Sequence, residues 1–190
     1  MRKYLFLLAA IAMLCSCSGE KTEMPENSGD QFPIMAWIGV PESETTVERF
    51  KELKESGINI NFSVYSSLEA VEKALEVARQ TGVKLMPACP ELSMDTENAV
   101  KRLMNHPALA GYHLRDEPGA DDFSMLGEWV RKIQAIDSRH PCYINLFPNY
   151  AGQEVLIGKE GVLAPGEDPY AKHVEMFLAE VPVQFISFDH

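Results

Sequence analysis

Basic residues are scarce in this sequence. Of its 190 residues, 17 are Lys or Arg and 28 are Asp or Glu, which gives a formal net charge of −11. A surface that binds nucleic acid needs a basic footprint to neutralise phosphates, so this balance excludes nucleic acid as a partner. The acidity says nothing more about a ligand, because net charge far from zero also keeps a protein surface soluble.

Metal-ligand motifs and cysteine pairs are lacking too. The sequence contains no CxxC and no HExxH, the spacings typical of zinc sites, so we expect no metal and no other cofactor. Outside the amino-terminal segment, the only cysteines are Cys89 and Cys142. The strand pattern below places them at opposite sheet ends, beyond the ~7 Å that a disulfide can bridge. We therefore expect two buried thiols, even in an oxidising compartment.

Residues 1–16 have the features of an export signal. Two basic residues precede an apolar run over 5–14 that is too short to span a bilayer as a stable anchor. The sequence LCSC at 14–17 resembles a bacterial lipobox. This resemblance implies cleavage before Cys17, acylation of that cysteine, and lipid anchoring to the bacterial outer membrane or cell surface as the chain's one membrane contact. A plain secretory signal cut nearby is the alternative.

Two further segments follow. Residues 17–31 are polar, with Gly, Pro and Ser and little to bury, and we interpret them as a tether. Residues 32–190 are the expected folded domain. The chain is 46% hydrophobic, as in an ordinary globular protein with one core.

Strand-like apolar runs alternate with stretches of helical period throughout 32–190. The expected strands are 32–40, 58–65, 83–88, 111–117, 142–147 and 183–188, the expected helices lie near 46–56, 67–81, 96–104, 121–134 and 170–180, and 151–169 is an expected long loop. Such alternation predicts a parallel sheet with right-handed crossovers. The turn at 39–41 lacks the glycines of a phosphate-binding loop, which disfavours a dinucleotide fold. We predict an α/β fold of the (β/α)8 TIM-barrel type with about six of its eight βα units, and with exposed strand edges prone to pairing or aggregation.

The stretch GYHLRDEP at 111–118 is the candidate site. It has the pattern of a strand that ends in charged residues and is stopped by a proline. Strand alternation would place His113, Arg115 and Glu117 on one face and Tyr112, Leu114 and Asp116 on the other. Charges at the edge of a core are costly unless they face a cleft, and parallel α/β folds bind ligands at the carboxyl ends of their strands. A salt bridge between Arg115 and Glu117 at the rim is the alternative.

This pattern resembles clan A of the glycoside hydrolases, whose fourth strand ends in Asn-Glu-Pro with the Glu as acid/base. The triplet here is Asp116-Glu117-Pro118, as in relatives of the β-galactosidase type, and Asp in place of Asn leaves open how the sugar 2-hydroxyl is held. The resemblance extends over 32–190. It implies hydrolysis of O-glycosidic bonds in an oligo- or polysaccharide by a retaining double displacement, with Glu117 as acid/base at a raised pKa. The clan's nucleophile, a Glu ending strand seven, is not in this sequence, so we do not expect these residues alone to complete the reaction.

Other strand ends supply predicted substrate contacts. They are Trp37 as a stacking platform (or a core residue), Tyr65 and Asn145 as hydrogen-bonding groups, Arg115 and Asp116 beside the acid, and Asp189 and His190 by their position in the clan.

Two different interpretations stay open. One is a non-catalytic, glycan-binding envelope lipoprotein with a degenerate barrel. The other is a different barrel enzyme. A metal-dependent isomerase could use only Glu117, Asp189 and His190 as ligands, and an aldolase would need a strand-end lysine, whereas Lys84 lies within an expected strand.

Overall fold

The computed structural model describes residues 32–189. The chain divides into two units, Met1–Phe32 and Pro33–His190, and the second is described by itself. The predicted signal at 1–16, the tether at 17–31 with Cys17, and His190 lie outside the described residues. Within 32–189, no helix is both long and apolar enough to cross a membrane.

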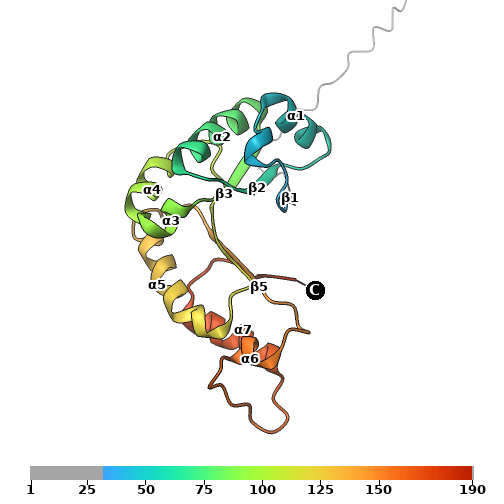
Figure 1. Ribbon diagram of the computed structural model, residues 1–190, viewed down its shortest axis with the longest axis vertical. Helices are drawn as coiled ribbons and strands as arrows, with labels where there is room; N and C mark the ends of the chain where they lie inside the picture. Colours follow the sequence, from blue (N-terminus) through green and yellow to red (C-terminus); the bar gives the residue numbers. More distant parts are fainter. Residues whose placement is uncertain (1–31, 190) are drawn as a thin grey trace, which may run out of the picture. The chain divides into compact units, whose positions relative to one another are not determined.

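Strands and helices alternate along the second unit (Figure 1). The strands are β1 (Met35–Ala36), β2 (Ile60–Val64), β3 (Lys84–Ala88), β4 (Tyr112–Asp116), β5 (Cys142–Leu146) and β6 (Ser187–Phe188). The helices are α1 (Val47–Glu55), α2 (Leu68–Thr81), α3 (Pro90–Met94), α4 (Thr96–Leu103), α5 (Phe123–Gln134), α6 (Gln153–Ile157) and α7 (Pro169–Glu180), with 3-10 turns η1 (Glu42–Glu44) and η2 (Ala120–Asp122).

The strands form two parallel sheets in sequence order, β1-β2-β3 and β4-β5-β6. The sheets join at Leu85, whose N–H donates to Ala108 O and whose carbonyl accepts from Ala110 N, both at 2.8 Å. The predicted mixed α/β fold with parallel sheets is therefore confirmed. The six described strands do not by themselves form a closed (β/α)8 barrel, which needs eight.

The helices cover one face of the strands, which we call the outer face (Figure 1). The main core lies there and includes Leu85, Tyr112 and Ile144 from the strands. The inner face carries a smaller cluster formed by Phe62, Met86 and Tyr143. Parallel sheets are normally covered on both faces, and here the inner face holds the aromatic and polar side chains of the candidate site.

Helix boundaries follow local signals in the sequence. Thr46 caps α1 by accepting a hydrogen bond from Arg49 N at 3.3 Å, and Ser67 caps α2 through Ala70 N at 3.2 Å. Each such cap stabilises a helix by about 1 kcal/mol. Gly82 ends α2 with φ at 72°, a left-handed conformation that glycine adopts without steric cost.

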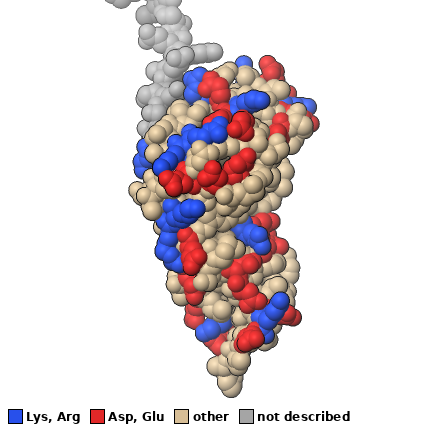
Figure 2. Space-filling view, turned by 60° about the vertical axis from the view of Figure 1, so that its left-hand side comes forward, with Lys and Arg blue, Asp and Glu red and all other residues tan. Residues whose placement is uncertain are grey.

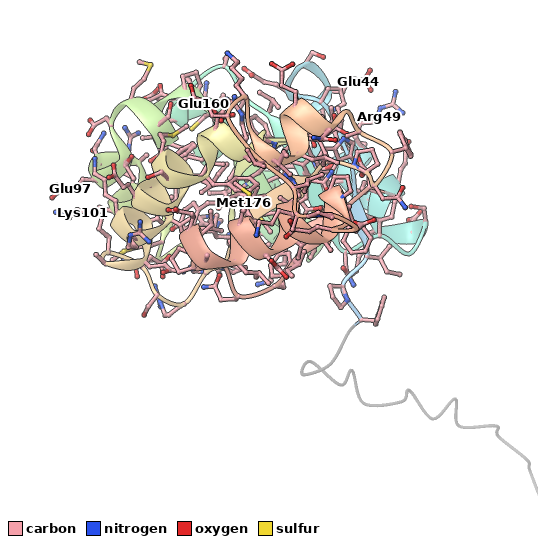
Figure 3. All side chains as sticks on the ribbon, turned by 90° about the horizontal axis from the view of Figure 1, so that it is seen from below. Glu44, Arg49, Glu97, Lys101, Glu160 and Met176 are labelled. Atoms are coloured by element: carbon pink, nitrogen blue, oxygen red, sulfur yellow. The ribbon has the colours of Figure 1, made fainter. Side chains whose placement is uncertain are left out.

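Charged side chains are concentrated on the helices. Acidic and basic groups alternate on the face shown in Figure 2, and several are paired, such as Arg102 with Glu72 at 2.7 Å. Figure 3 shows the ion pairs Glu44–Arg49 and Glu97–Lys101 at the periphery, away from the strands. Exposed pairs of this kind contribute about 0–1 kcal/mol each, so they favour solubility more than stability.

The two cysteines of this unit are buried, and both are free thiols, as predicted. Burial raises the pKa of Cys89 to about 11. Burial, with a smaller effect of Asp137, raises the pKa of Cys142 to about 12. Both thiols are therefore neutral at ordinary pH and act as small apolar core residues.

Candidate active site

A β-bulge in β4 determines which charged side chains meet at its carboxyl end. His113 lies opposite Tyr143 of β5, but Arg115 lies opposite Ile144, so Leu114 is an extra residue in the ladder. A bulge interrupts the alternation of faces. The predicted grouping of His113, Arg115 and Glu117 on one face is therefore wrong beyond Leu114.

Arg115 forms its ion pair with an acid other than Glu117. Its guanidinium pairs with the Asp122 carboxylate on η2 at 3.4 Å, so the alternative rim salt bridge to Glu117 is not the pair that forms. Asp116 instead lies opposite Asn145 and accepts a hydrogen bond from its side chain. At this end of β4 the inner face therefore carries the acid Asp116, where strict alternation predicted the base Arg115.

Asn145 connects three strands. Its Nδ2 donates to Asp116 Oδ1 at 3.2 Å and to Asp189 Oδ1, just beyond β6, at 3.1 Å. Its Oδ1 accepts from Ser187 Oγ at 2.8 Å, so the Tyr143 hydroxyl, 2.7 Å from Ser187 Oγ, is the donor in that contact. Asn145 is only 3% exposed, and these bonds fix the orientation of its amide.

Glu117 follows directly after β4 in an unusual backbone conformation. Its φ is 45°, in the left-handed region that non-glycine residues seldom occupy and that tends to occur at functional sites. Its N–H donates to the Asn145 carbonyl at 2.8 Å. The turn places the carboxyl group close enough to Asp189 for the charge of that acid to act on it.

The surroundings of Glu117 favour its protonated form. Partial burial raises the pKa of Glu117, and the negative charges of Asp116 and Asp189 raise it further. A carboxyl group with a raised pKa can serve as a general acid. The surroundings of Glu117 therefore favour the protonation state that a general acid requires.

Trp37 covers the inner-face aromatic cluster. Its ring centroid lies 4.6 Å from that of Phe62, 5.5 Å from His113 and 6.1 Å from Tyr143, yet the residue is 42% exposed. One part of the ring is packed and another is open to solvent. Trp37 therefore contributes to packing and also presents part of its side chain to solvent; its role as a stacking platform stays a prediction.

Tyr65 does not lie at the candidate site. It is 1% exposed and belongs to the core between strands and helices, because it continues the outer-face alternation of Asn61 and Ser63 in β2. A role in substrate contact does not fit that position, so this prediction is corrected.

Sequence reasoning missed Ser187 and Tyr143. Alternation from Asn145 would have placed Tyr143 on the same face, two residues earlier. Ser187 gave no signal, since a serine near a strand end is common and its contact with Asn145 joins segments 42 residues apart.

A metal centre finds no support within 32–189, where no group of three or more His, Cys, Asp and Glu side chains is arranged to hold an ion. Asp116 and Asp189 accept hydrogen bonds from the Asn145 side chain, and the Glu117 N–H donates to the Asn145 carbonyl. His190, the remaining proposed ligand, lies outside this range.

Successive parallel βα units, with polar groups gathered at the carboxyl ends of β4, β5 and β6, define a mixed α/β fold with parallel sheets. No family model matches the sequence, and no curated protein matches it. Among solved structures, an endo-1,4-beta-mannanase from Eisenia fetida is similar in fold, with a TM-score of 0.52 and 10% sequence identity. The similarity covers 75% of this chain and 59% of the mannanase chain. At this identity it shows the fold alone, that of a TIM-barrel-like protein.

Proposed function

We propose that this chain carries the acid/base half of a retaining glycoside hydrolase site, with Glu117 as the proton donor. The observation that supports this most directly is the position of Glu117 at the end of β4, where partial burial, Asp116 and Asp189 raise its pKa. Trp37 supplies an exposed aromatic surface at the end of β1, suited to the C–H face of a sugar ring.

In the first step, the Glu117 carboxyl group gives its proton to the glycosidic oxygen as the bond from that oxygen to the anomeric carbon breaks. A second carboxylate bonds to the same carbon. In the next step, the Glu117 carboxylate takes a proton from water, which attacks the anomeric carbon and releases that second group. The two carboxyl groups of such a pair lie ~5–5.5 Å apart. Asp189 raises the pKa of Glu117, so we assign it to favouring the protonated form of Glu117 and not to attack.

We propose β-1,4-linked neutral polysaccharides, mannan first, as the substrate class. The support is the fold similarity to a protein described as an endo-1,4-beta-mannanase, together with the open ring of Trp37. Mannotetraose, cellotetraose and laminaritetraose form a first panel of probes.

The test uses the full-length native protein. Glu117→Gln should lower turnover of a cleaved tetrasaccharide about 10²–10⁴-fold, because the departing sugar then lacks its proton. A 2,4-dinitrophenyl glycoside of the same sugar needs no protonation, so its first step should be far less affected. Glu160→Gln, at an exposed residue, is the matched control. Equal losses of kcat/KM, which reports the first step, on both substrates would contradict an acid role for Glu117.

A glycan-binding protein without turnover is the second proposal. Exposed rings favour it, since Phe188 is 53% exposed near the Tyr170 ring and Trp37 is open as well. Here the wild-type protein would bind a tetrasaccharide without cleaving it, and Glu117→Gln would leave the affinity unchanged.

We also propose that the chain is exported and acylated at Cys17, on the support of the lipobox-like sequence at 14–17. Metabolic labelling with an alkyne-bearing fatty acid should mark the wild type. Cys17→Ala should abolish the label, whereas Cys15→Ala should keep it. Labelling that persists in Cys17→Ala would overturn this assignment.

A further inference from the structure

A pocket of about 370 Å³ lies beside Glu117, on the side of η2 and α6. Glu117 forms part of its wall, Phe147 and Val155 give it an apolar surface, and Asp121, Glu154 and Lys159 line it as well. Its volume falls within the ~300–1,000 Å³ of small-ligand sites. It is therefore large enough for a ligand group that reaches Glu117.

The walls of this pocket are fixed by packing. Leu156 and Ile157 of α6 are buried, and the His173 ring donates from Nδ1 to the Leu156 carbonyl at 2.6 Å. The turn after β4 lies close to α6, since a Cβ at Gly119 would be 3.4 Å from the Val155 carbonyl. These contacts hold α6 in place, so the space next to Val155 is preformed.

The charges in the pocket select against anions. Its lining contains the acids Glu117, Asp121, Asp122 and Glu154 and one basic residue, Lys159. The Asp122 carboxylate is partly offset by its pair with Arg115. An acidic ligand group would meet this excess of like charge in a partly enclosed space. A neutral, hydroxyl-bearing ring would find both apolar surface and hydrogen-bonding groups.

We propose that this pocket binds the leaving-group side of the glycan, and that it accepts an uncharged hexose and rejects a uronic acid. The assignment rests on the proposed function, because the proton of Glu117 goes to the oxygen of the leaving sugar. The group that departs must therefore lie next to Glu117, and Val155 then forms the opposite wall of its subsite.

Binding can be measured separately from turnover in the full-length Glu117→Gln protein. Mannotetraose, cellotetraose and tetramannuronate, which is β-1,4-linked like mannotetraose but carries a carboxylate on each sugar, are titrated by calorimetry into this parent. The same titrations are made with parents that also carry Val155→Trp or Val162→Trp. Val155→Trp fills the pocket. Val162→Trp adds the same ring to the same segment at a residue that is 86% exposed and outside the pocket. Lys159→Trp, at an exposed rim residue, blocks the pocket without touching α6 packing, should Val155→Trp fail to fold.

The expected result is at least a tenfold loss of affinity for the neutral tetrasaccharide in Val155→Trp and Lys159→Trp, and less than a twofold change in Val162→Trp. Tetramannuronate should bind the parent at least tenfold more weakly than mannotetraose. Equal affinities in all folded variants, or equal binding of tetramannuronate and mannotetraose, would overturn the proposal. A parent that binds none of the probes would overturn it together with the proposed function. If Val155→Trp loses binding and the wild type shows no turnover, the pocket is a glycan-binding site but the proposed hydrolysis is wrong.

Discussion

The side-chain amide of Asn145 donates a hydrogen bond to Asp116 at 3.2 Å, across the junction of β4 and β5. The same nitrogen donates to Asp189 at 3.1 Å. Two carboxylates from different strands thus share one neutral donor, and Glu117 lies next to both. The amide offsets part of the repulsion that would otherwise separate these acids.

Asn145→Asp should therefore destabilise the fold. The change replaces a shared donor by a third acid, so two hydrogen bonds are lost and like charges are left in contact. We expect the free energy of unfolding to fall by about 1–3 kcal/mol at pH 7, and by less at pH 4, where carboxyl groups begin to protonate. Urea unfolding measures this. Asn149→Asp makes the same charge change at an exposed position and should have little effect, and equal losses in both variants would contradict the role of Asn145.

The pH dependence of activity should follow the protonation of Glu117. Burial raises its pKa, and Asp116 and Asp189 raise it further. A general acid works in its protonated form, so turnover falls as the pH rises through that pKa. Asp189→Asn removes one negative neighbour, which lowers the pKa of Glu117 and moves the alkaline limb of the rate profile to lower pH. Glu160→Gln is the control, and a limb that stays in place in Asp189→Asn would show that Asp189 does not act on Glu117.

His113 should make stability depend on pH. Its ring is stacked between Phe62 at 4.2 Å and Tyr143 at 5.6 Å, and burial lowers the pKa of His113 to about 4. Below the unfolded value of 6.5 the unfolded chain binds a proton that the folded chain does not, so stability falls as pH drops from 6.5 towards 4, by up to about 3 kcal/mol.

His113→Phe keeps an aromatic ring at this position and removes the titrating group. Compared with wild type, this variant should be more stable at pH 4.5 than it is at pH 7.5, measured by urea unfolding at both values. Tyr143→Phe is the control within the same cluster, and its difference from wild type should be nearly the same at both pH values. A constant difference for His113→Phe as well would refute the assignment.

Asp137 should be a stabilising buried acid. It accepts from the Tyr112 hydroxyl at 2.7 Å, from Arg139 N at 3.0 Å, and contacts His140 Nδ1 at 2.6 Å. Burial alone would raise the pKa of Asp137, but the hydrogen bonds from Tyr112, His140 and Arg139 outweigh it, and the pKa is lowered.

Asp137→Asn should cost about 2–3 kcal/mol of unfolding free energy at pH 7, since bonds to a charged acceptor are lost. A lowered pKa contributes stability above the unfolded value of 3.8 and loses it as pH falls through the folded value. Wild type and variant should therefore converge below about pH 3.8 in denaturant titrations. Asp95→Asn, at an exposed residue, should show neither effect.

Local signals in the sequence predicted much of the fold. The caps at Thr46 and Ser67 and the stop at Gly82 are encoded in neighbouring residues, and the structure confirms them. The expected strands at 32–40 and 183–188 shrink to two residues each in β1 and β6. Apolar composition gives the extent of a buried run, but strand length also depends on pairing with a neighbour.

Two short helices could not be predicted in the same way. α3 begins at Pro90, and α6 lies inside the expected loop at 151–169. Each spans five residues, too few to show a clear helical period. The position of α6 is set by tertiary contacts of Leu156 and Ile157, which the local sequence does not reveal.

The candidate site was predicted in its position but not in its orientation. Charged residues after a strand indicated Glu117, and the strand order brought Asn145 and Asp189 to it. The bulge at Leu114 exchanged the places of Arg115 and Asp116. A bulge is one extra residue measured against a partner strand, so β4 alone could not show it.

The join between the two sheets has a consequence for the inner face. Trp37 follows β1 of the first sheet and Glu117 follows β4 of the second, and the two sheets meet through the backbone of Leu85. The Trp37 ring also packs across this join, against His113 and Tyr143 of the second sheet. Substitutions at the join can therefore change the distance between the aromatic ring and the acid while both side chains stay the same.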